Sequence, residues 1–167
     1  AEAMEELGFE TGISSRSSGD NFVSDCTIET DQLALIPDSY IDMTAEKIRI
    51  YKELDSLTSE KDLINMKNRL TDRFGKMPVE LERLFDIVRI RQLGQKLGFE
   101  KIIIKNGVMI AFFITNPLSQ YYRSDRFSKV LENVNLNPKL FEIKQPDGRL
   151  RIMVRNVDGI SKAYDIL

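Results

Sequence analysis

The chain has 167 residues, of which 42% are hydrophobic and 30% are charged, and its formal net charge is −2. These values are typical of one globular domain with a core of its own, and no apolar run approaches the roughly 18 residues of a membrane span. The absence of histidine and the single cysteine exclude an internal disulfide, a Cys–His nucleophile and a cysteine-rich zinc site. A lone cysteine is also consistent with a cytoplasmic location.

The charge is unevenly distributed along the chain. Residues 1–45 contain ten acidic residues and one basic residue, whereas residues 46–105 contain ten acidic and fourteen basic residues. Residues 106–167 contain six acidic and nine basic residues. The first segment is therefore acidic and the rest mildly basic, which is far from the basic stripe expected of a dedicated nucleic-acid module.

Residues 1–26 are predicted to form a lead that precedes the domain. Residues 1–10 favour a helix fragment, and residues 11–20 are rich in serine and glycine, which is typical of a flexible linker. Such a composition cannot repay the entropy of ordering, so we expect the chain to be mobile and dispensable for folding as far as about Ser24. Cys26 is expected to be a small packing residue.

A strand and a helix are predicted next. Residues 27–36 favour an edge-like strand that ends at Pro37, because proline cannot donate to a strand ladder. Thr44 is predicted to cap a helix that runs to about Leu57. The buried stripe of this helix is expected to consist of Ile48, Tyr51, Leu54 and Leu57.

The segment from Ser59 to Gly98 predicts two helices joined by a short turn. Ser59 is the expected N-cap of the first helix, and Gly75 is the expected left-handed residue at its end. Pro78 is expected at the first position of the second helix, where its missing N–H is no loss. The second helix has the wider apolar face, so it is expected to be the most buried in the chain. The apolar residues are Leu63, Ile64, Met66, Leu70 and Phe74 in the first helix, and Leu81, Leu84, Phe85, Ile87, Val88, Ile90, Leu93 and Leu97 in the second.

The remaining residues predict two hairpins and two helices. Asn106-Gly107 lies between two apolar runs, which is a strong hairpin signal, and the apolar content of the strands requires that helices cover at least part of the hairpin. The order of elements predicts an α+β fold, a single compact domain in which N-terminal helices pack on antiparallel hairpins. The predicted elements are strands 99–105 and 108–114, a helix at 124–133, strands 140–144 and 150–155 around Asp147-Gly148, and a closing helix at 160–167.

Catalytic patterns are missing from the sequence. It contains no Gly-x-x-x-x-Gly-Lys-Ser/Thr and no Gly-x-Gly-x-x-Gly, and acid pairs such as Glu80/Glu82 are expected by chance. We therefore expect a non-catalytic binding or regulatory module that needs no cofactor or metal and neither binds nor hydrolyses ATP.

One cluster combines aromatic and basic residues: Tyr121, Tyr122, Arg123 and Arg126. Proteins that bind single strands stack bases on such aromatic side chains. A single-stranded nucleic-acid-binding module is therefore the alternative function. The other interpretation is that two tyrosines anchor a loop beside solvated arginines.

The turn between the two central helices resembles a family signature. Asp72-Arg73-Phe74-Gly75, followed by Lys76-Met77-Pro78, is similar to the Asp-Arg-Phe-Gly-x-x-Pro signature in the C-terminal domain of bacterial transcription-repair coupling factors, the Mfd proteins. The resemblance extends over roughly residues 27–114, in the order of the family. It also rests on Pro37-Asp38-Ser39-Tyr40-Ile41, Arg49-Ile50-Tyr51-Lys52, Arg89-Ile90-Arg91 and Lys96-Leu97-Gly98.

This resemblance implies a function and a division of the chain. Residues 27–167 would be the C-terminal regulatory domain, and residues 1–26 the tail of a preceding translocase module with its linker. In the family, the parent is an ATP-dependent DNA translocase that removes stalled RNA polymerase and recruits nucleotide excision repair. The domain docks on the UvrB-like N-terminal region of the same protein, and this docking masks the surface that binds UvrA. The implied partners are therefore that region and, indirectly, UvrA, with RNA polymerase and DNA bound by other domains and no membrane.

The resemblance also implies a docking site. The docking charges of the family lie on the helix that ends in the signature, and Asp72 matches one of them. Arg69 stands where the family usually has an acid, so the salt-bridge pattern differs here, and Arg73 is the neighbouring cation. Phe74, Gly75 and Pro78 are expected to serve the structure of the turn, because helix-end chemistry accounts for them.

Overall fold

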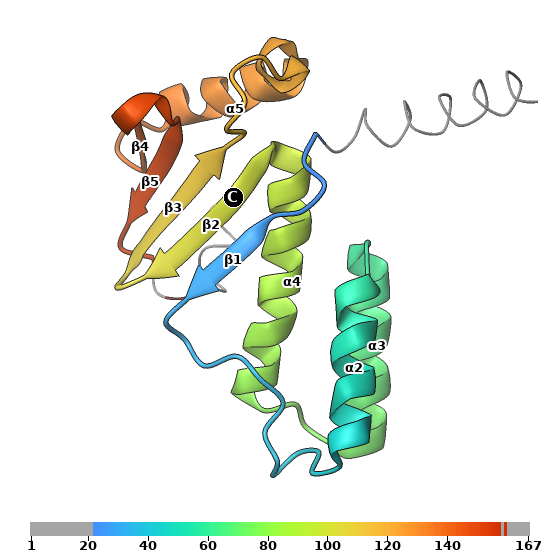
Figure 1. The fold of residues 1–167 in the computed structure, drawn as a ribbon. Coiled ribbons are helices and arrows are strands. Elements are labelled where there is room, and N and C mark those ends of the chain that lie inside the picture. The colour runs from blue at the N-terminus through green and yellow to red at the C-terminus, as the bar shows by residue number, and fades with distance from the viewer. Residues whose placement is uncertain (1–21, 158, 160–167) are drawn as a thin grey trace, which may run out of the picture.

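The computed structural model describes residues 22–157 and 159, which form four α-helices, five strands and two short 3-10 helices (Figure 1). The helices are α2 (Thr44–Ser56), α3 (Glu60–Phe74), α4 (Val79–Leu97) and α5 (Asp125–Leu136). The strands are β1 (Thr27–Thr30), β2 (Phe99–Lys105), β3 (Val108–Phe113), β4 (Phe141–Lys144) and β5 (Arg151–Arg155), and the 3-10 helices are η1 (Gln120–Arg123) and η2 (Pro146–Gly148). The closing helix predicted at 160–167 lies outside the described residues.

The strands form one mixed sheet in the order β1-β2-β3-β5-β4. β1 pairs parallel to β2, and the other neighbours pair antiparallel. The α+β prediction and the edge position of β1 are confirmed, but the strand predicted at 27–36 ends at Thr30. The Gln32 N–H donates to the hydroxyl of Thr30, which turns the chain out of the strand, and Leu33 is 58% exposed. Pro37 therefore does not terminate the strand.

Both predicted hairpins are present. Asn106 and Gly107 have φ of 54° and 73°, the pair of positive values that a tight turn between twisted strands needs. Asp147 and Gly148 have φ of 54° and 78° at the second turn. The first hairpin packs only one of its faces under helices, since its burial alternates along β3.

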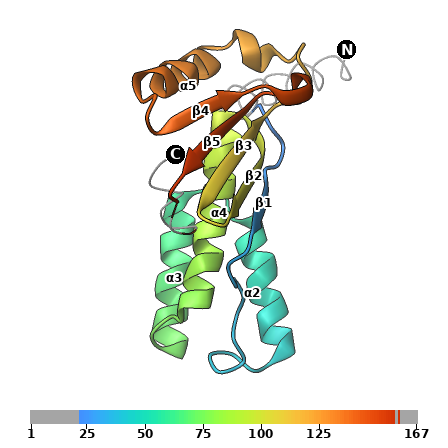
Figure 2. The ribbon, with the colours of Figure 1, turned by 90° about the vertical axis from the view of Figure 1, so that its left-hand side faces the viewer.

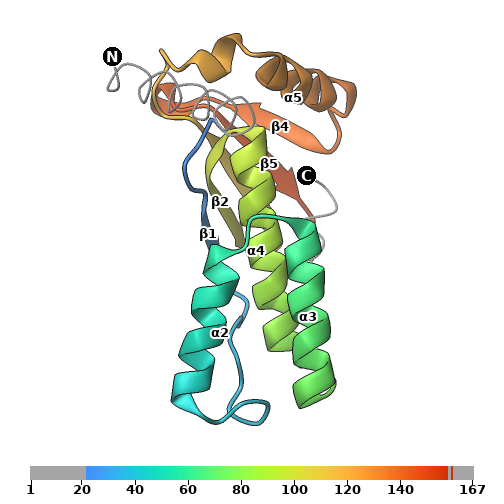
Figure 3. The same ribbon diagram turned by 90° about the vertical axis from the view of Figure 1, so that its right-hand side faces the viewer.

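Helix α4 joins two hydrophobic cores (Figure 1). Its N-terminal half packs with α2 and α3 around Leu63, Met66 and Phe85. Its C-terminal half packs on the sheet, where Ile90 is completely buried among strand residues. The prediction that this helix is the most buried is confirmed, and the reason is that it belongs to both cores. Figure 3 shows the helical end of the molecule, with α2, α3 and α4 side by side.

Helix α2 buries a face that matches the prediction only in part. Leu54 is 2% exposed as predicted, but Ile50, also 2% exposed, replaces Ile48 and Tyr51, which are 48% and 37% exposed. The Tyr51 hydroxyl accepts a hydrogen bond of 2.8 Å from the Ile36 N–H, which holds the ring at the edge of the core. The N-cap is Met43 and not Thr44, and it makes no side-chain capping bond.

The α3–α4 connection follows the prediction closely. The Ser59 hydroxyl accepts from the Asp62 N–H at 3.1 Å, and Gly75 adopts φ of 91° and ψ of −165°, a conformation nearly confined to glycine. Two details were predicted wrongly. Pro78 is the N-cap of α4 and not its first helical residue, and Ile64 is 50% exposed outside the apolar stripe.

Helices α4 and α5 cover the same face of the sheet (Figures 1 and 2). Strand register places Ile102, Ala111 and Ile152 in one row on that face, and all three are buried. None of the elements described for residues 22–157 covers the opposite face. We call that opposite face, formed by the strand residues whose side chains alternate away from the core, the open sheet face.

The start of the described chain packs on the core. Phe22 lies edge-on to Tyr121 with 5.4 Å between ring centroids, and Val23 is only 8% exposed. The expectation of a mobile lead as far as Ser24 is therefore wrong for these two residues. Cys26 is 1% exposed against Gly94 of α4, which confirms its packing role.

Candidate docking surface on helix α3

Two of the three predicted docking charges are tied to helix α2. Arg69 forms an ion pair with Glu53. Arg73 pairs with Glu46 at 2.8 Å, and its guanidinium carbon lies 4.8 Å from the centroid of the Phe74 ring. A hydrogen bond from Arg49, together with the charges of Arg49 and Arg73, holds the pKa of Glu46 below its usual value. Arg69 and Arg73 therefore link α3 to α2 in this structure.

Asp72 differs from its neighbours. It is exposed, and within residues 22–157 it has no ion pair or side-chain hydrogen bond. It also lies in the last turn of α3, where a negative charge opposes the helix dipole by about 0.3–1 kcal/mol. An unpaired carboxylate at an unfavourable helix end is free to meet a cation on another surface.

Tyr40 fixes the signature turn, and sequence reasoning did not single it out. Its hydroxyl lies 2.8 Å from the Gly75 carbonyl oxygen and 3.1 Å from that of Leu70, and burial raises its pKa. The rings of Tyr40 and Phe74 are 5.8 Å apart, and Phe74 is half-buried. The signal was present, because Tyr40 belongs to the segment 37–41 that resembles the family.

The structure contradicts the stacking role predicted for Tyr121 in the tyrosine cluster. Tyr121 is completely buried, its hydroxyl donates to the Leu97 carbonyl, and burial raises its pKa strongly. Tyr122 donates to the Ile114 carbonyl and stacks edge-on against Phe127. The Tyr121 ring has no exposed face for a base, and both hydroxyl groups anchor the segment between β3 and α5.

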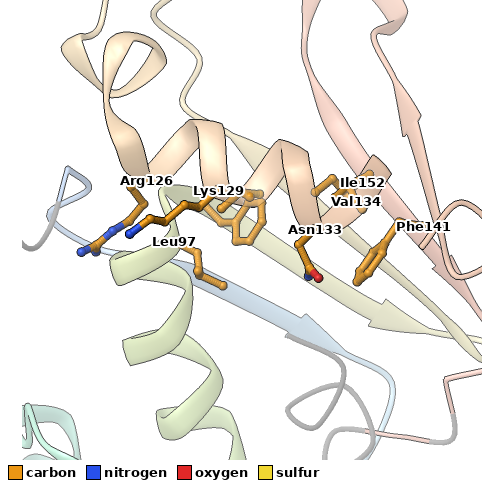
Figure 4. Close-up of a pocket in the computed structure, with 9 residues that line it drawn as sticks. Leu97, Arg126, Lys129, Asn133, Val134, Phe141 and Ile152 are labelled. Atoms are coloured by element: carbon orange, nitrogen blue, oxygen red, sulfur yellow. The ribbon is translucent and has the colours of Figure 1, made fainter. Parts of the chain in front are cut away.

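A cavity of about 210 Å³ lies between the C-terminal end of α4, helix α5 and the sheet (Figure 4). Arg126 and Lys129 stand at one end, and the Arg126 guanidinium donates to the Lys96 carbonyl at the end of α4. The other lining residues are Leu97, Phe99, Val130, Asn133, Val134, Phe141 and Ile152. The lining has no carboxylate, hydroxyl or thiol, so this cavity is mostly apolar, with Arg126, Lys129 and Asn133 as its polar residues.

Residues 22–157 contain no group of three or more acidic or cysteine side chains arranged to hold a metal ion. No helix among them is both long and apolar enough to cross a bilayer.

Comparison with known proteins decides the family. The model of the TRCF domain matches residues 30–124, which is more than half of the chain. This chain belongs to the TRCF domain family. The match includes α2, α3, the signature turn and α4, together with the first hairpin.

Relatives of this TRCF domain are transcription-repair-coupling factors. The one from Rickettsia conorii is 32% identical over 133 residues, which are 79% of this chain and 11% of the relative. The one from Staphylococcus haemolyticus is 43% identical over 137 residues, 75% of this chain and 12% of the relative. The chain thus spans about a tenth of the length of these curated relatives.

A solved structure shares the fold. The crystal structure of the C-terminal domain of a transcription-repair coupling factor superposes with a TM-score of 0.68, covering 84% of this chain and 85% of that one, at 17% sequence identity. The sheet with its helical extension is therefore the fold of that domain.

Proposed function

We propose that this TRCF domain is a non-catalytic regulatory domain of a cytoplasmic, ATP-dependent DNA translocase that couples transcription to nucleotide excision repair. Residues 1–26 would connect it to the translocase module, and other domains of the parent would bind RNA polymerase and DNA. In the resting state, the domain docks on the UvrB-like N-terminal region and masks the surface for UvrA. The exposed carboxylate of Asp72 at the end of α3, which has no ion-pair partner within residues 22–157, is the observation that carries this proposal.

The arrangement of charges explains why Asp72 is the central contact. Arg69 and Arg73 already have carboxylate partners on α2, so their charges are largely compensated within the domain. Asp72 lies between them on α3 without such a partner in the described residues. A cation on the docking partner would gain a contact with Asp72, and reversing the charge would leave that cation facing another one. Arg69 occupies a position where the family has an acid, and its pairing with Glu53 gives that difference an internal role.

The proposal is tested in the full-length parent with Asp72→Lys. The variant should weaken docking of the domain and increase the amount of UvrA that the parent binds in a pull-down or in calorimetry. The fold should not suffer, because a lysine in the last turn of α3 is favoured by the helix dipole by about 0.3–1 kcal/mol.

Glu132→Lys is the matched control. Glu132 is an exposed helical acid without an ion pair in the described chain, and it lies on α5, away from α3. The Glu132→Lys variant changes the net charge by the same amount as Asp72→Lys, and it should leave UvrA binding by the parent unaltered. Equal UvrA binding by Asp72→Lys and the unmodified parent, with both domains folded, would place the docking contact elsewhere.

A further inference from the structure

The open sheet face has a row of cations with an aromatic ring among them. Strand register sets Lys101 beside Phe112, Phe112 beside Arg151, and Arg151 beside Lys144, across four neighbouring strands. Their neighbours along the strands alternate into the core, so these four side chains share the open face. In Figure 1 β1 runs in front of α4, and residues of α4 and α5 pack against the buried face of the sheet, opposite these four side chains.

Phe112 is bracketed by two arginines. The guanidinium carbon of Arg149 lies 4.6 Å from the ring centroid, and that of Arg151 lies 6.0 Å from it. Neither arginine has a carboxylate partner among the described residues, and the Arg151 Nε has no hydrogen-bond acceptor although it is buried. Two guanidinium groups without a carboxylate partner in the described part of the chain therefore stand at one aromatic ring.

The other cations of this face share two acids at its margins. Glu29 pairs with Lys101 at 3.0 Å and with Lys105 at 3.6 Å. Glu142 pairs with Lys144 at 3.4 Å and with Arg155 at 3.7 Å. The face thus carries six cations, counting both arginines at Phe112, against two acids.

The cations on this face destabilise the sheet. Arg151 and Lys144 are directly opposite each other on antiparallel strands, an arrangement of like charges that destabilises a sheet. Residues 96–157 contain eleven basic and five acidic residues, so the sheet half of the chain is basic although the whole chain is acidic. A bound polyanion would turn the repulsion into an attraction.

We propose that the open sheet face binds single-stranded nucleic acid, with a base stacked at Phe112 and phosphates held by Arg149 and Arg151. Base faces stack on aromatic rings and on guanidinium planes, and guanidinium forks fit phosphate oxygens. Ile103, Ile110 and Met153 form the next row of half-buried side chains, which gives neighbouring bases an apolar floor.

Three other occupants fit the face less well. A second copy of the chain would bring one basic face against another, which like charges oppose. An acidic protein would satisfy the charge but has no particular use for an aromatic ring between two guanidinium groups.

Duplex DNA hides its base faces, so the proposal also requires that single strands bind more tightly than duplexes. The open face lies away from the exposed end of α3, so this inference does not depend on the proposed docking function.

The test is fluorescence anisotropy of the 167-residue chain with a labelled oligonucleotide of about twelve thymidines, a length within the usual range of such sites. Binding should be saturable at about 50 mM salt and weaken as salt rises. Arg149→Gln with Arg151→Gln should lower affinity at least about tenfold and reduce the salt dependence by roughly 1.4 logarithmic units per decade, since each phosphate contact on a single strand contributes about 0.7. Phe112→Leu preserves the charge and should lower affinity about tenfold through lost stacking.

The matched control is Lys61→Gln with Lys76→Gln, which removes two exposed charges near the ends of α3. Its affinity should stay within about twofold of the unmodified chain, and all variants should retain their circular dichroism spectrum. No saturable binding, equal loss in the control, or tighter binding of a duplex of the same length would overturn the proposal. Tighter binding of polyglutamate than of the oligonucleotide would also overturn it and assign the face to an acidic protein.

Discussion

Replacing Gly94 with alanine tests the closest approach between helix α4 and the segment that leads into β1. A Cβ atom at this position would lie 2.7 Å from Cys26 Sγ and 3.2 Å from Ile102 Cδ1. Non-bonded heavy atoms prefer separations of roughly 3.5–4 Å, and Cys26 is only 1% exposed, so the sulfur has little space into which to move. The variant should therefore strain the packing of residues 22–26 on α4.

The magnitude follows from two opposing effects. Alanine is better than glycine inside a helix by about 1 kcal/mol. Overpacking a closed site costs about 1–3 kcal/mol. The expected result is a net loss of about 1 kcal/mol, measured as a lower urea midpoint at an unchanged slope.

A double-mutant cycle separates these effects. Cys26→Ala removes the sulfur from the contact, although the Cβ of residue 26 remains 3.3 Å from the new Cβ. The double variant should be more stable than the sum of the single changes by about 1–2 kcal/mol, because the clash is relieved while the helix gain remains. A Gly94→Ala variant about 1 kcal/mol more stable than the parent chain, with no coupling to Cys26→Ala, would refute the packing argument.

Three further predictions concern the same two cores. Gly98→Ala should lower the free energy of unfolding, measured by urea titration, by more than Gly94→Ala does. Gly98 has φ of +92°, and a Cβ atom there would lie 2.2 Å from the Tyr121 ring. A loss of stability below about 1 kcal/mol would contradict this contact. Phe74→Ala should lower the free energy of unfolding by about 1–3 kcal/mol in the same assay, because Phe74 is half-buried. A fully buried phenylalanine typically loses about 3–5 kcal/mol, so a loss of that size would show that the turn is more enclosed. Burial raises the pKa of Cys26 from 9.0 to about 12, so above about pH 9 the folded chain holds a proton that the unfolded chain releases. Stability should then fall as pH rises from about 9 to 12 and fall less steeply in Cys26→Ala, and parallel curves for the two proteins would contradict this linkage.

The sequence predicted best where structure is decided locally. Ser59, Gly75 and the Asn106-Gly107 turn act on their nearest backbone groups, and each was found where the sequence placed it. The prediction failed where distant packing chooses among apolar residues. Helix α2 has two candidate faces that share Leu54, and contact with α3 and α4 selects Ile50 over Ile48 and Tyr51.

The docking surface was predictable in part. The position of Asp72 on the outer side of α3 follows from helical spacing and the apolar stripe. The pairing of Arg69 with Glu53 does not, because it joins residues on different helices whose relative rotation the sequence leaves open. Tyr40 was missed for a similar reason, since its hydroxyl reaches the Gly75 carbonyl 35 positions further along the chain.

The open sheet face was missed because only strand order creates it. Lys101, Phe112 and Arg151 lie on three neighbouring strands, β2, β3 and β5. Strand β5 follows β4 in the sequence, but in the sheet it lies between β3 and β4. The available signal was the alternation of basic and apolar residues in strands β2 and β5, which places the charges on one face once the other face is known to be buried.

The docking surface at Asp72 and the open sheet face can be tested separately. Asp72 lies at the end of α3 furthest from the sheet, because α3 begins beside the C-terminal half of α4, where Glu60 meets Arg89, and runs away from it (Figure 3). Docking through α3 therefore leaves Arg149 and Arg151 accessible, unless the partner also covers the sheet. If the surfaces are independent, Asp72→Lys changes UvrA binding by the parent without changing oligonucleotide affinity, and the Arg149/Arg151 double variant does the reverse. If instead either change alters both measurements in the full-length parent, the docked partner reaches the open sheet face, and nucleic acid and the N-terminal region compete for it.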